Sequence, residues 1–232
     1  MSGESHTQPV GRPLSGWTPP PRPPRTPLSG RFSRLEPLDA GAHADELFAA
    51  NSADQAGRMW TYLPYGPFAS QADYRDWMER TCRGDDPLFY AIGDVASGRA
   101  AGVAAYLRVD PANGAIEIGH LAYSPALQRT TAATEALFLM IDRVFGLGYR
   151  RCEWKCDSLN APSRAAATRL GFTFEGVFRQ AVVVKGRNRD TAWFSIIDSE
   201  WPERRAGFVR WLAPENFDAA GRQRIPLSEA RA

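Results

Sequence analysis

The sequence predicts a protein of the α+β (α/β) class, built around a sheet with helices on its faces. The chain has 232 residues and is 44% hydrophobic, enough for one large domain or two small ones with a sizeable core. From residue 31 onward, short alternating or apolar runs are separated by amphipathic stretches. Turn residues at 97–98 and 110–114 separate consecutive apolar runs, which indicates hairpins and therefore antiparallel neighbours.

The individual elements follow from local signals. Ser70 stands before an amphipathic stretch with Asp73 in its first turn, which predicts a capped helix start. After residue 125 apolar residues recur with helical period until Gly146 and Gly148, which end that helix, and Gly171 ends a later one. We expect further helices at 42–50, 70–83 and 160–170, and strands at 31–38, 88–95, 101–109, 115–123, 151–156, 172–184 and 191–197.

Composition divides the chain into three segments. Residues 1–30 hold eight of the 18 prolines and cannot bury enough apolar area to fold alone, so we predict an extended arm. A solvated tail is favoured over a docking or dimer-embracing strap. Residues 31–201 form the predicted domain, and residues 202–232 form a more polar extension. We expect Trp211, Leu212 and Phe217 to hold this extension against the core.

Charge and cysteine content exclude several classes of function. With 28 basic and 26 acidic residues the net charge is +2, so we predict no nucleic-acid or membrane partner. Three cysteines do not make a disulfide framework, which favours reduced thiols and a cytoplasmic location. None of the three histidines lies at ligand spacing from another histidine or a cysteine, so no metal is predicted.

Two motifs point to a specific chemistry. The segment Gln128-Arg-Thr-Thr-Ala-Ala-Thr-Glu-Ala136 lies between a strand and a helix, where free N–H groups and the helix dipole favour an anion. Asn160-Ala-Pro-Ser163 and Arg169-Leu-Gly-Phe172 follow at the two ends of a later helix. With the order of elements, these motifs resemble the GNAT superfamily of N-acetyltransferases, most closely its RimJ/RimL-type branch, over about 170 residues.

The resemblance implies a mixed sheet whose fourth and fifth strands splay apart, with acetyl-CoA as acyl donor and its pyrophosphate on the N–H groups of the turn. The family pattern is Gln/Arg-x-x-Gly-x-Gly/Ala, and Thr131 stands where its first glycine is expected. Thr131 must therefore keep an ordinary backbone. The alternative is an ordinary helix start capped by threonines. The cofactor-binding residues implied are Leu121, Tyr123, Gln128, Arg129, Thr130, Thr131, Ala132, Ala133 and Asn160.

The resemblance also suggests which residues take the proton from the amine and give a proton to the departing sulfur. Gly119 is the expected place of the family's strand bulge. Glu117 matches the position of the general base, or else is a solvent-facing strand residue. Many family members have a tyrosine as general acid where this chain has Ala167, so Ser163 is the catalytic candidate for protonating the sulfur, or else a helix-start serine. His120 has the opposite side-chain parity to Glu117 unless the bulge resets it, and we expect it to be packed rather than catalytic.

The acceptor side is less defined. Trp60, Tyr62 and Tyr65 lie on a loop between helices and are predicted to wall the acceptor pocket, with packing in the core as the alternative. The predicted function is acetyl transfer from acetyl-CoA to a primary amine, either a protein N-terminus or a small molecule, by direct attack in a ternary complex. The alternative is a non-catalytic CoA-binding sensor, which Thr131 and Ala167 motivate. The sequence leaves the acceptor and the oligomeric state, a homodimer included, undetermined.

Overall fold

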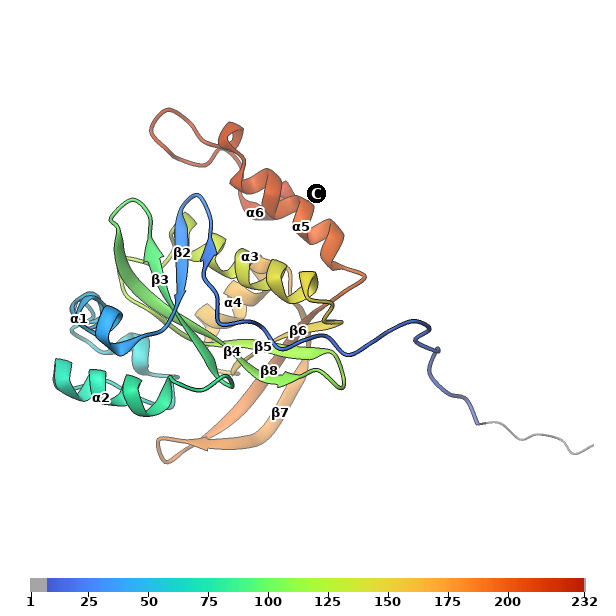
Figure 1. The fold of residues 1–232 in the computed structure, drawn as a ribbon, viewed down its shortest axis with the longest axis horizontal. Coiled ribbons are helices and arrows are strands. Elements are labelled where there is room, and N and C mark those ends of the chain that lie inside the picture. The colour runs from blue at the N-terminus through green and yellow to red at the C-terminus, as the bar shows by residue number, and fades with distance from the viewer. Residues whose placement is uncertain (1–7, 232) are drawn as a thin grey trace, which may run out of the picture.

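In the described part of the chain, eight strands form one sheet at the centre of the molecule (Figure 1). The computed structural model describes residues 8–231. The strand order is β1-β2-β3-β4-β5-β6-β8-β7, and each neighbouring pair is antiparallel except β5 and β6, which are parallel. The predicted mixed, mostly antiparallel sheet is confirmed. The strands are β1 Leu28–Ser29, β2 Ser33–Pro37, β3 Leu88–Asp94, β4 Arg99–Asp110, β5 Ala115–Tyr123, β6 Arg151–Asp157, β7 Thr173–Val184 and β8 Arg187–Ile197.

Helices cover both faces of this sheet. Figure 1 shows α1 and α2 together on one side and α3, α4 and α5 on the other. Each group closes its own hydrophobic core, which we call the first core (with α3, α4 and α5) and the second core (with α1 and α2). The helices are α1 Ala40–Asn51, α2 Gln71–Thr81, α3 Thr131–Gly146, α4 Ala161–Leu170, α5 Trp201–Leu212 and α6 Leu227–Ala230, with short 3-10 turns η1 Arg58–Trp60 and η2 Pro214–Asn216.

The capping signals in the sequence correspond to the ends of the helices. The Ser70 side chain accepts from the backbone N–H of Asp73 and starts α2. Gly171, with φ of 97°, ends α4 in the left-handed conformation that favours glycine. The apolar stripe of α3 is buried in the first core from Ala136 to Val144. These signals are local, which is why the sequence shows them.

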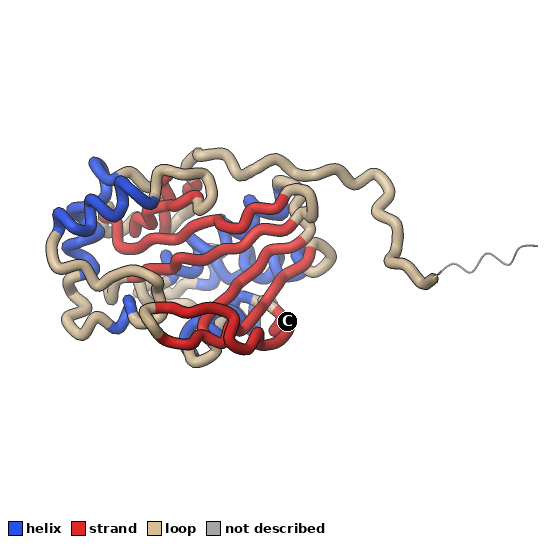
Figure 2. The backbone as a smooth tube through the Cα atoms, turned by 90° about the horizontal axis from the view of Figure 1, so that it is seen from below, coloured by secondary structure: helices blue, strands red, loops and turns tan. Residues whose placement is uncertain are grey.

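The N-terminal segment differs from the predicted solvated tail. Its first described residues do run away from the body (Figure 2). Residues 20–29, however, lie against the domain, where Tyr90 donates its hydroxyl to the carbonyl oxygen of Pro24 at 3.1 Å. Arg143 donates to the carbonyl oxygens of Thr26 and Pro27, both at 2.8 Å. The prediction of a solvated tail is therefore wrong for this stretch, because side chains of the domain satisfy its carbonyl groups.

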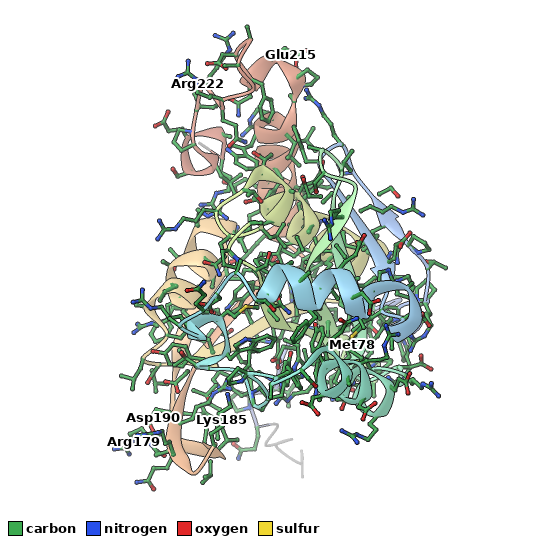
Figure 3. The ribbon with its side chains drawn as sticks, turned by 90° about the vertical axis from the view of Figure 1, so that its left-hand side faces the viewer. Met78, Arg179, Lys185, Asp190, Glu215 and Arg222 are labelled. Atoms are coloured by element: carbon green, nitrogen blue, oxygen red, sulfur yellow. The ribbon has the colours of Figure 1, made fainter. Side chains whose placement is uncertain are left out.

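The hairpin of β7 and β8 is longer than predicted. Its turn is only Lys185 and Gly186, both with positive φ (49° and 72°), so pairing begins at Val184 with Arg187. The strand predicted from residue 191 therefore starts at residue 187. Lys185 and Asp190 lie together at the free end of this hairpin (Figure 3). The tip also contacts the end of η1, because Lys185 Nζ donates to the Trp60 carbonyl oxygen at 2.8 Å.

The C-terminal extension packs on the first core. Trp211 is 5% exposed, and the Phe217 ring lies 5.0 Å from that of Phe32. What the sequence did not predict is the helix α5, which carries Trp211 and packs beside α3. No helix among residues 8–231 is long and apolar enough to span a bilayer.

Candidate active site

The two parallel strands at the centre of the sheet separate partway along their length. β5 and β6 are paired only from Ala115 with Arg151 to Glu117 with Glu153, although β5 continues to Tyr123 and β6 to Asp157. Beyond Glu117, backbone groups of β5 on this side have no partner strand within residues 8–231. A cavity of about 1220 Å³ opens at the split, above the roughly 300–1,000 Å³ of ordinary ligand pockets. It has room for a long ligand and a second reactant.

A bulge in β5 lies beside the split and changes which side chains face which core. Val103 pairs with Ala122 and Ala105 with Gly119, so one residue of β4 faces both His120 and Leu121. His120 takes the positive φ of 53°. The bulge therefore lies one residue beyond Gly119, the position predicted from the sequence. Gly119 leaves room for Leu107, since a Cβ at residue 119 would lie 3.1 Å from the Leu107 side chain.

The bulge resets the alternation of side chains along β5. Ile116 and Ile118 belong to the first core, so Glu117 between them faces the second. After the bulge Ala122 belongs to the second core, and His120 stacks on Tyr65 with ring centroids 5.6 Å apart. Glu117 and His120 therefore face the same side of the sheet and both line the cavity. Burial lowers the pKa of His120 to about 4, so the imidazole is neutral near pH 7.

The turn before α3 presents free backbone donors to the cavity. Thr130 is the N-cap, and its hydroxyl accepts from the N–H of Ala133 at 3.1 Å. Thr131 has an ordinary helical backbone, as predicted, and the positive φ of 62° falls on Arg129 instead. Within the described residues, the N–H groups of Thr131 and Ala132 have no acceptor. The turn thus combines threonine capping with free N–H groups, which together fit an anion.

Most of the predicted cofactor residues line one cavity. Gln128 is fixed there by a 2.8 Å bond from its Nε2 to the Tyr123 carbonyl oxygen. Ala132 does not line the cavity, because its side chain is packed into the first core, and only its N–H is available. The predicted cofactor residues on the cavity wall are Leu121, Tyr123, Gln128, Arg129, Thr130, Thr131, Ala133 and Asn160.

Glu117 lies where the two strands part, with 3% of its surface exposed. Its Oε2 accepts from Arg108 at 2.7 Å and from Lys155 at 3.0 Å, so it is not the solvent-facing residue of the alternative interpretation. Burial raises the pKa of Glu117, and the two cations partly offset that effect. Its Oε1 has no hydrogen-bond partner among the described residues. The carboxylate can therefore accept a proton at one oxygen while the other is held in place.

Arg108 is positioned by a second bulge, at the far end of β4. Its backbone has φ of 47°, and the Asp86 carboxylate accepts from the N–H groups of Arg108 and Val109 at 2.8 and 3.0 Å. Lys155 contacts Glu153 at 2.7 Å and lies 3.8 Å from the centroid of the Trp193 ring. The Glu117 carboxylate thus belongs to a network of charged side chains from β4, β5 and β6, and the Trp193 ring of β8 packs against Lys155.

Ser163 approaches the cavity from α4, on the side of the first core. Its backbone N–H donates to Asn160 Oδ1 at 3.1 Å, so Asn160 is the N-cap of α4 and a cavity-lining residue at once. The Trp154 indole donates its N–H to the Ser163 hydroxyl at 3.0 Å. Because an indole can only donate, the serine oxygen accepts this bond and its own hydrogen can be donated, with the Cys156 thiol as a neighbour inside the cavity wall. Ala167 is fully buried in the first core and has no group to offer.

Of the three aromatics predicted to wall the acceptor pocket, the loop after α1 brings one to the cavity. Tyr62 lines the cavity and donates its hydroxyl to the Leu159 carbonyl oxygen at 3.1 Å. Trp60 is 5% exposed and packs edge-on against Phe68, with centroids 5.5 Å apart. Tyr65 packs on Trp77 at 4.3 Å. The prediction that Trp60 and Tyr65 wall the cavity is wrong, because the aromatic packing of the second core draws them inward.

Sequence reasoning missed several residues of the cavity wall. Lys155 had a signal, since residues 151–157 alternate charged and apolar side chains and place it on the same face as Glu153. Arg108 had none, because its position depends on a bulge. Trp211 and residues 223–227 also line the cavity. They are far in sequence from the strands and the turn that form the rest of the wall, so no local pattern reveals them. Among residues 8–231, no group of three or more histidine, cysteine or acidic side chains is arranged to hold a metal.

Comparison with known proteins agrees with this geometry. The profile described as "Acetyltransferase (GNAT) domain" matches residues 34–173, more than half of the chain. The chain belongs to the GNAT acetyltransferase family. It is a GNAT N-acetyltransferase, and the mixed sheet with one parallel pair is the fold of that family. Members use acetyl-CoA and act on amine acceptors. No curated protein matches the chain in sequence.

Solved structures give the same result for this GNAT protein. A GCN5-related N-acetyltransferase from Brucella melitensis is 54% identical, with a TM-score of 0.91, over 94% of this chain and 99% of that one. A probable GNAT-family acetyltransferase from Chromobacterium violaceum is 46% identical, with a TM-score of 0.78, over 84% and 98% of the two chains. The microcin C7 self-immunity acetyltransferase MccE, solved with acetyl-CoA and AMP, is 23% identical over 72% and 93%, with a TM-score of 0.64, and shows the fold alone.

Proposed function

We propose that this protein transfers the acetyl group of acetyl-CoA to a primary amine by direct attack in a ternary complex, with Glu117 as general base and Ser163 as general acid. The observation that carries the proposal is the split between β5 and β6 after Glu117, with one large cavity reaching both residues. Glu117 reaches it from the face of α1 and α2, and Ser163 from α4 on the opposite face. Proton acceptor and proton donor thus flank the two sides of the split.

The cavity supports acetyl-CoA as the donor. The unpaired backbone of β5 beyond Glu117 offers strand-like hydrogen bonds to the pantetheine amides, and the free N–H groups of Thr131 and Ala132 suit its pyrophosphate. Arg129 adds a positive charge at the same turn. Acetyl-CoA supplies the acetyl group as a thioester. The chain supplies the binding groups and the proton transfers.

The charges around Glu117 also act on the acceptor amine. An alkylamine of pKa about 10 is mostly protonated at pH 7 and cannot attack. Arg108 and Lys155 disfavour a third positive charge nearby and so lower the pKa of an amine bound there. Glu117 Oε1 takes the proton directly or through a water molecule. At the other side, Ser163 donates its hydroxyl hydrogen to the departing sulfur and takes a proton from a water molecule, so the serine ends as a hydroxyl and CoA leaves as a thiol.

For the acceptor we propose a protein N-terminus or a small-molecule amine, as in the RimJ/RimL-type branch that the motifs resemble. A protein from Vibrio cholerae described as a "putative ribosomal-protein-serine acetyltransferase" shares the fold at 22% identity and a TM-score of 0.64. We propose a cytoplasmic location, with which three free, buried cysteines are consistent.

The test is a titration of acetyl-CoA followed by a thiol-release assay. Acetyl-CoA is first titrated calorimetrically into the full chain. Peptides with free N-termini, amino acids and simple amines are then supplied in turn, each with its N-acetylated form as a control. We expect thiol release with at least one free amine and with none of the blocked ones. Tight binding of acetyl-CoA without release from any acceptor would show a CoA-binding sensor instead.

A further inference from the structure

One end of the cavity is built from the C-terminal extension, outside residues 34–173 that the family profile matches. Its wall consists of the start of α3, the outer part of α4, and a segment that runs from Trp211 to Leu227. We call that last segment the C-terminal wall. Its cavity-lining residues are Trp211, Gln223, Arg224, Ile225, Pro226 and Leu227.

The C-terminal wall is held rigidly by one buried asparagine. Asn216 Nδ2 donates to the Trp211 carbonyl oxygen at 2.8 Å, and Asn216 Oδ1 accepts from the Ile225 N–H at 3.0 Å. Its backbone carbonyl accepts from the Arg224 N–H at 2.7 Å. Phe217 and Gln223 form an isolated β-bridge. Asn216 is only 7% exposed. A loop fixed by such a buried residue holds its side chains in defined positions.

The polar groups at this end are donors. Trp211 Nε1 and Gln223 Nε2 are buried nitrogen atoms without a partner among the described residues. Arg169 of α4 lines the same end, and its one described hydrogen bond goes to the Thr134 hydroxyl at 3.0 Å. Arg224 is a further cation. The two carboxylates on the cavity wall, Glu117 and Asp157, belong to β5 and β6.

Such a surface is complementary to phosphate groups. Buried donors without acceptors cost about 1–3 kcal/mol each until a ligand satisfies them. Guanidinium groups without a carboxylate partner suit phosphate oxygens, which they can bind in pairs. The burial of Arg169 lowers its pKa, as expected of a cation that lacks a counter-charge. The turn before α3, at this same end, presents its free N–H groups.

We propose that the C-terminal wall, through Gln223 and Arg224 and together with Arg169, binds the phosphate-bearing nucleotide end of acetyl-CoA. This inference rests on the proposed function. The C-terminal extension is then part of the acetyl-CoA site, which α3 and α4 form only in part. The pantetheine end lies along β5 and does not touch the C-terminal wall.

The experiment measures binding of fragments that contain one end of the donor. CoA, adenosine 3′,5′-bisphosphate and pantetheine are titrated calorimetrically into the full chain and into Gln223→Ala, Arg224→Ala and Arg169→Ala variants. We expect Kd for CoA and for the bisphosphate to rise about 5- to 50-fold in each variant, as for a lost hydrogen bond to a charged group. Kd for pantetheine should not change. Salt should weaken CoA binding less in the arginine variants.

The control is Arg222→Ala on the same segment. Arg222 points outward at the end of the extension (Figure 3) and is 81% exposed in an ion pair with Asp218. This variant should bind all three ligands as the wild type does. Unchanged CoA affinity in the Gln223, Arg224 and Arg169 variants overturns the inference, and so does an equal loss for pantetheine. If the wild type binds no acetyl-CoA, the proposed function falls with it. If the wild type binds acetyl-CoA and the three variants bind CoA as tightly as the wild type does, the inference alone is wrong.

Discussion

Trp154 donates its indole N–H to the hydroxyl of Ser163 across 3.0 Å, and this contact links the core of the sheet to the proposed acid. Trp154 is 3% exposed on β6, so its position is set by packing. Because the serine oxygen is occupied as an acceptor, its hydrogen can rotate toward the cavity. Trp154 is therefore a positioning residue for Ser163, and the pair should act as a unit.

This coupling gives the first prediction. Ser163→Ala should lower kcat by roughly 10²- to 10³-fold, the lower part of the range for a general acid. Trp154→Phe should lower kcat less, by about tenfold or below, because the hydroxyl remains but is no longer oriented. The double variant should be no slower than Ser163→Ala alone. Kd for acetyl-CoA and urea unfolding of each variant serve as controls. Additive losses in the double variant would contradict the coupling.

The second prediction concerns the pH dependence of activity. A general base must be deprotonated, so kcat/KM rises as pH rises through the pKa of Glu117. Burial raises this pKa above its ordinary value of 4.5, and the acid limb of the profile should lie above that pH. Glu117→Gln should lower kcat/KM by roughly 10²- to 10⁴-fold and remove this limb.

The limb set by the acceptor amine should remain in Glu117→Gln, because the amine itself is unchanged. Measuring kcat/KM for one acceptor from pH 4 to pH 9 separates the two limbs. Arg205→Ala, in a surface ion pair with Asp142, is a charge-changing control that should leave the profile as it is. If the limb at the lower pH, assigned to Glu117, persists in Glu117→Gln, that limb belongs to another group.

The sequence predicted local features of the fold and site well and long-range ones poorly. Ser70, Gly171 and the stripe of α3 mark helices through contacts within a few residues, and the structure has these helices where expected. The bulge at His120 depends on the register of β4, so the sequence placed it one residue early at Gly119. The position of the bulge decides that His120 lies on the same face of the sheet as Glu117.

The aromatic loop shows the same limit. Trp60, Tyr62 and Tyr65 have similar polarity and lie within six residues, so no local pattern separates them. The structure brings only Tyr62 to the cavity, because the other two rings fill the second core. The contribution of Gln223 likewise depends on tertiary packing, about 90 residues along the chain from the turn at Gln128.

The third prediction is a stability change with pH that depends on His120. Its pKa is lowered from 6.5 to about 4 in the folded protein, first by burial and second by Arg108. Between these values the unfolded chain binds a proton that the folded chain does not, so stability falls as pH falls through this window. At about 1.4 kcal/mol per unit, the loss reaches at most ~3 kcal/mol.

Urea unfolding of the wild type and of His120→Gln between pH 7 and pH 4 measures this loss. The difference between their unfolding free energies should change across the window, with the wild type losing more. Both proteins share every other titrating group, so the comparison isolates the imidazole. A constant difference from pH 7 to pH 4 would mean that His120 titrates normally and is open to water.

The fourth prediction concerns the anchor between α3 and β2. The Glu135 carboxylate is buried at 4% exposure and accepts from the N–H groups of Arg31, Phe32 and Ser33 at 2.9, 2.7 and 2.7 Å. The Ser33 hydroxyl adds a fourth bond at 3.0 Å. These residues are about a hundred apart in sequence. The contact fixes the first turns of α3, and thereby the turn at Thr130, against the sheet.

Glu135→Ala should lower the free energy of unfolding by about 3–5 kcal/mol, because the buried N–H and hydroxyl of Ser33 and two part-buried N–H groups lose their charged acceptor. Asp142→Ala is the matched control, since Asp142 lies on the same helix but pairs with Arg205 at the surface. Its loss should stay below about 1 kcal/mol. Urea unfolding measures both. Equal losses would show that the helix tolerates either carboxylate alike, and that α3 is held by its apolar stripe rather than by Glu135.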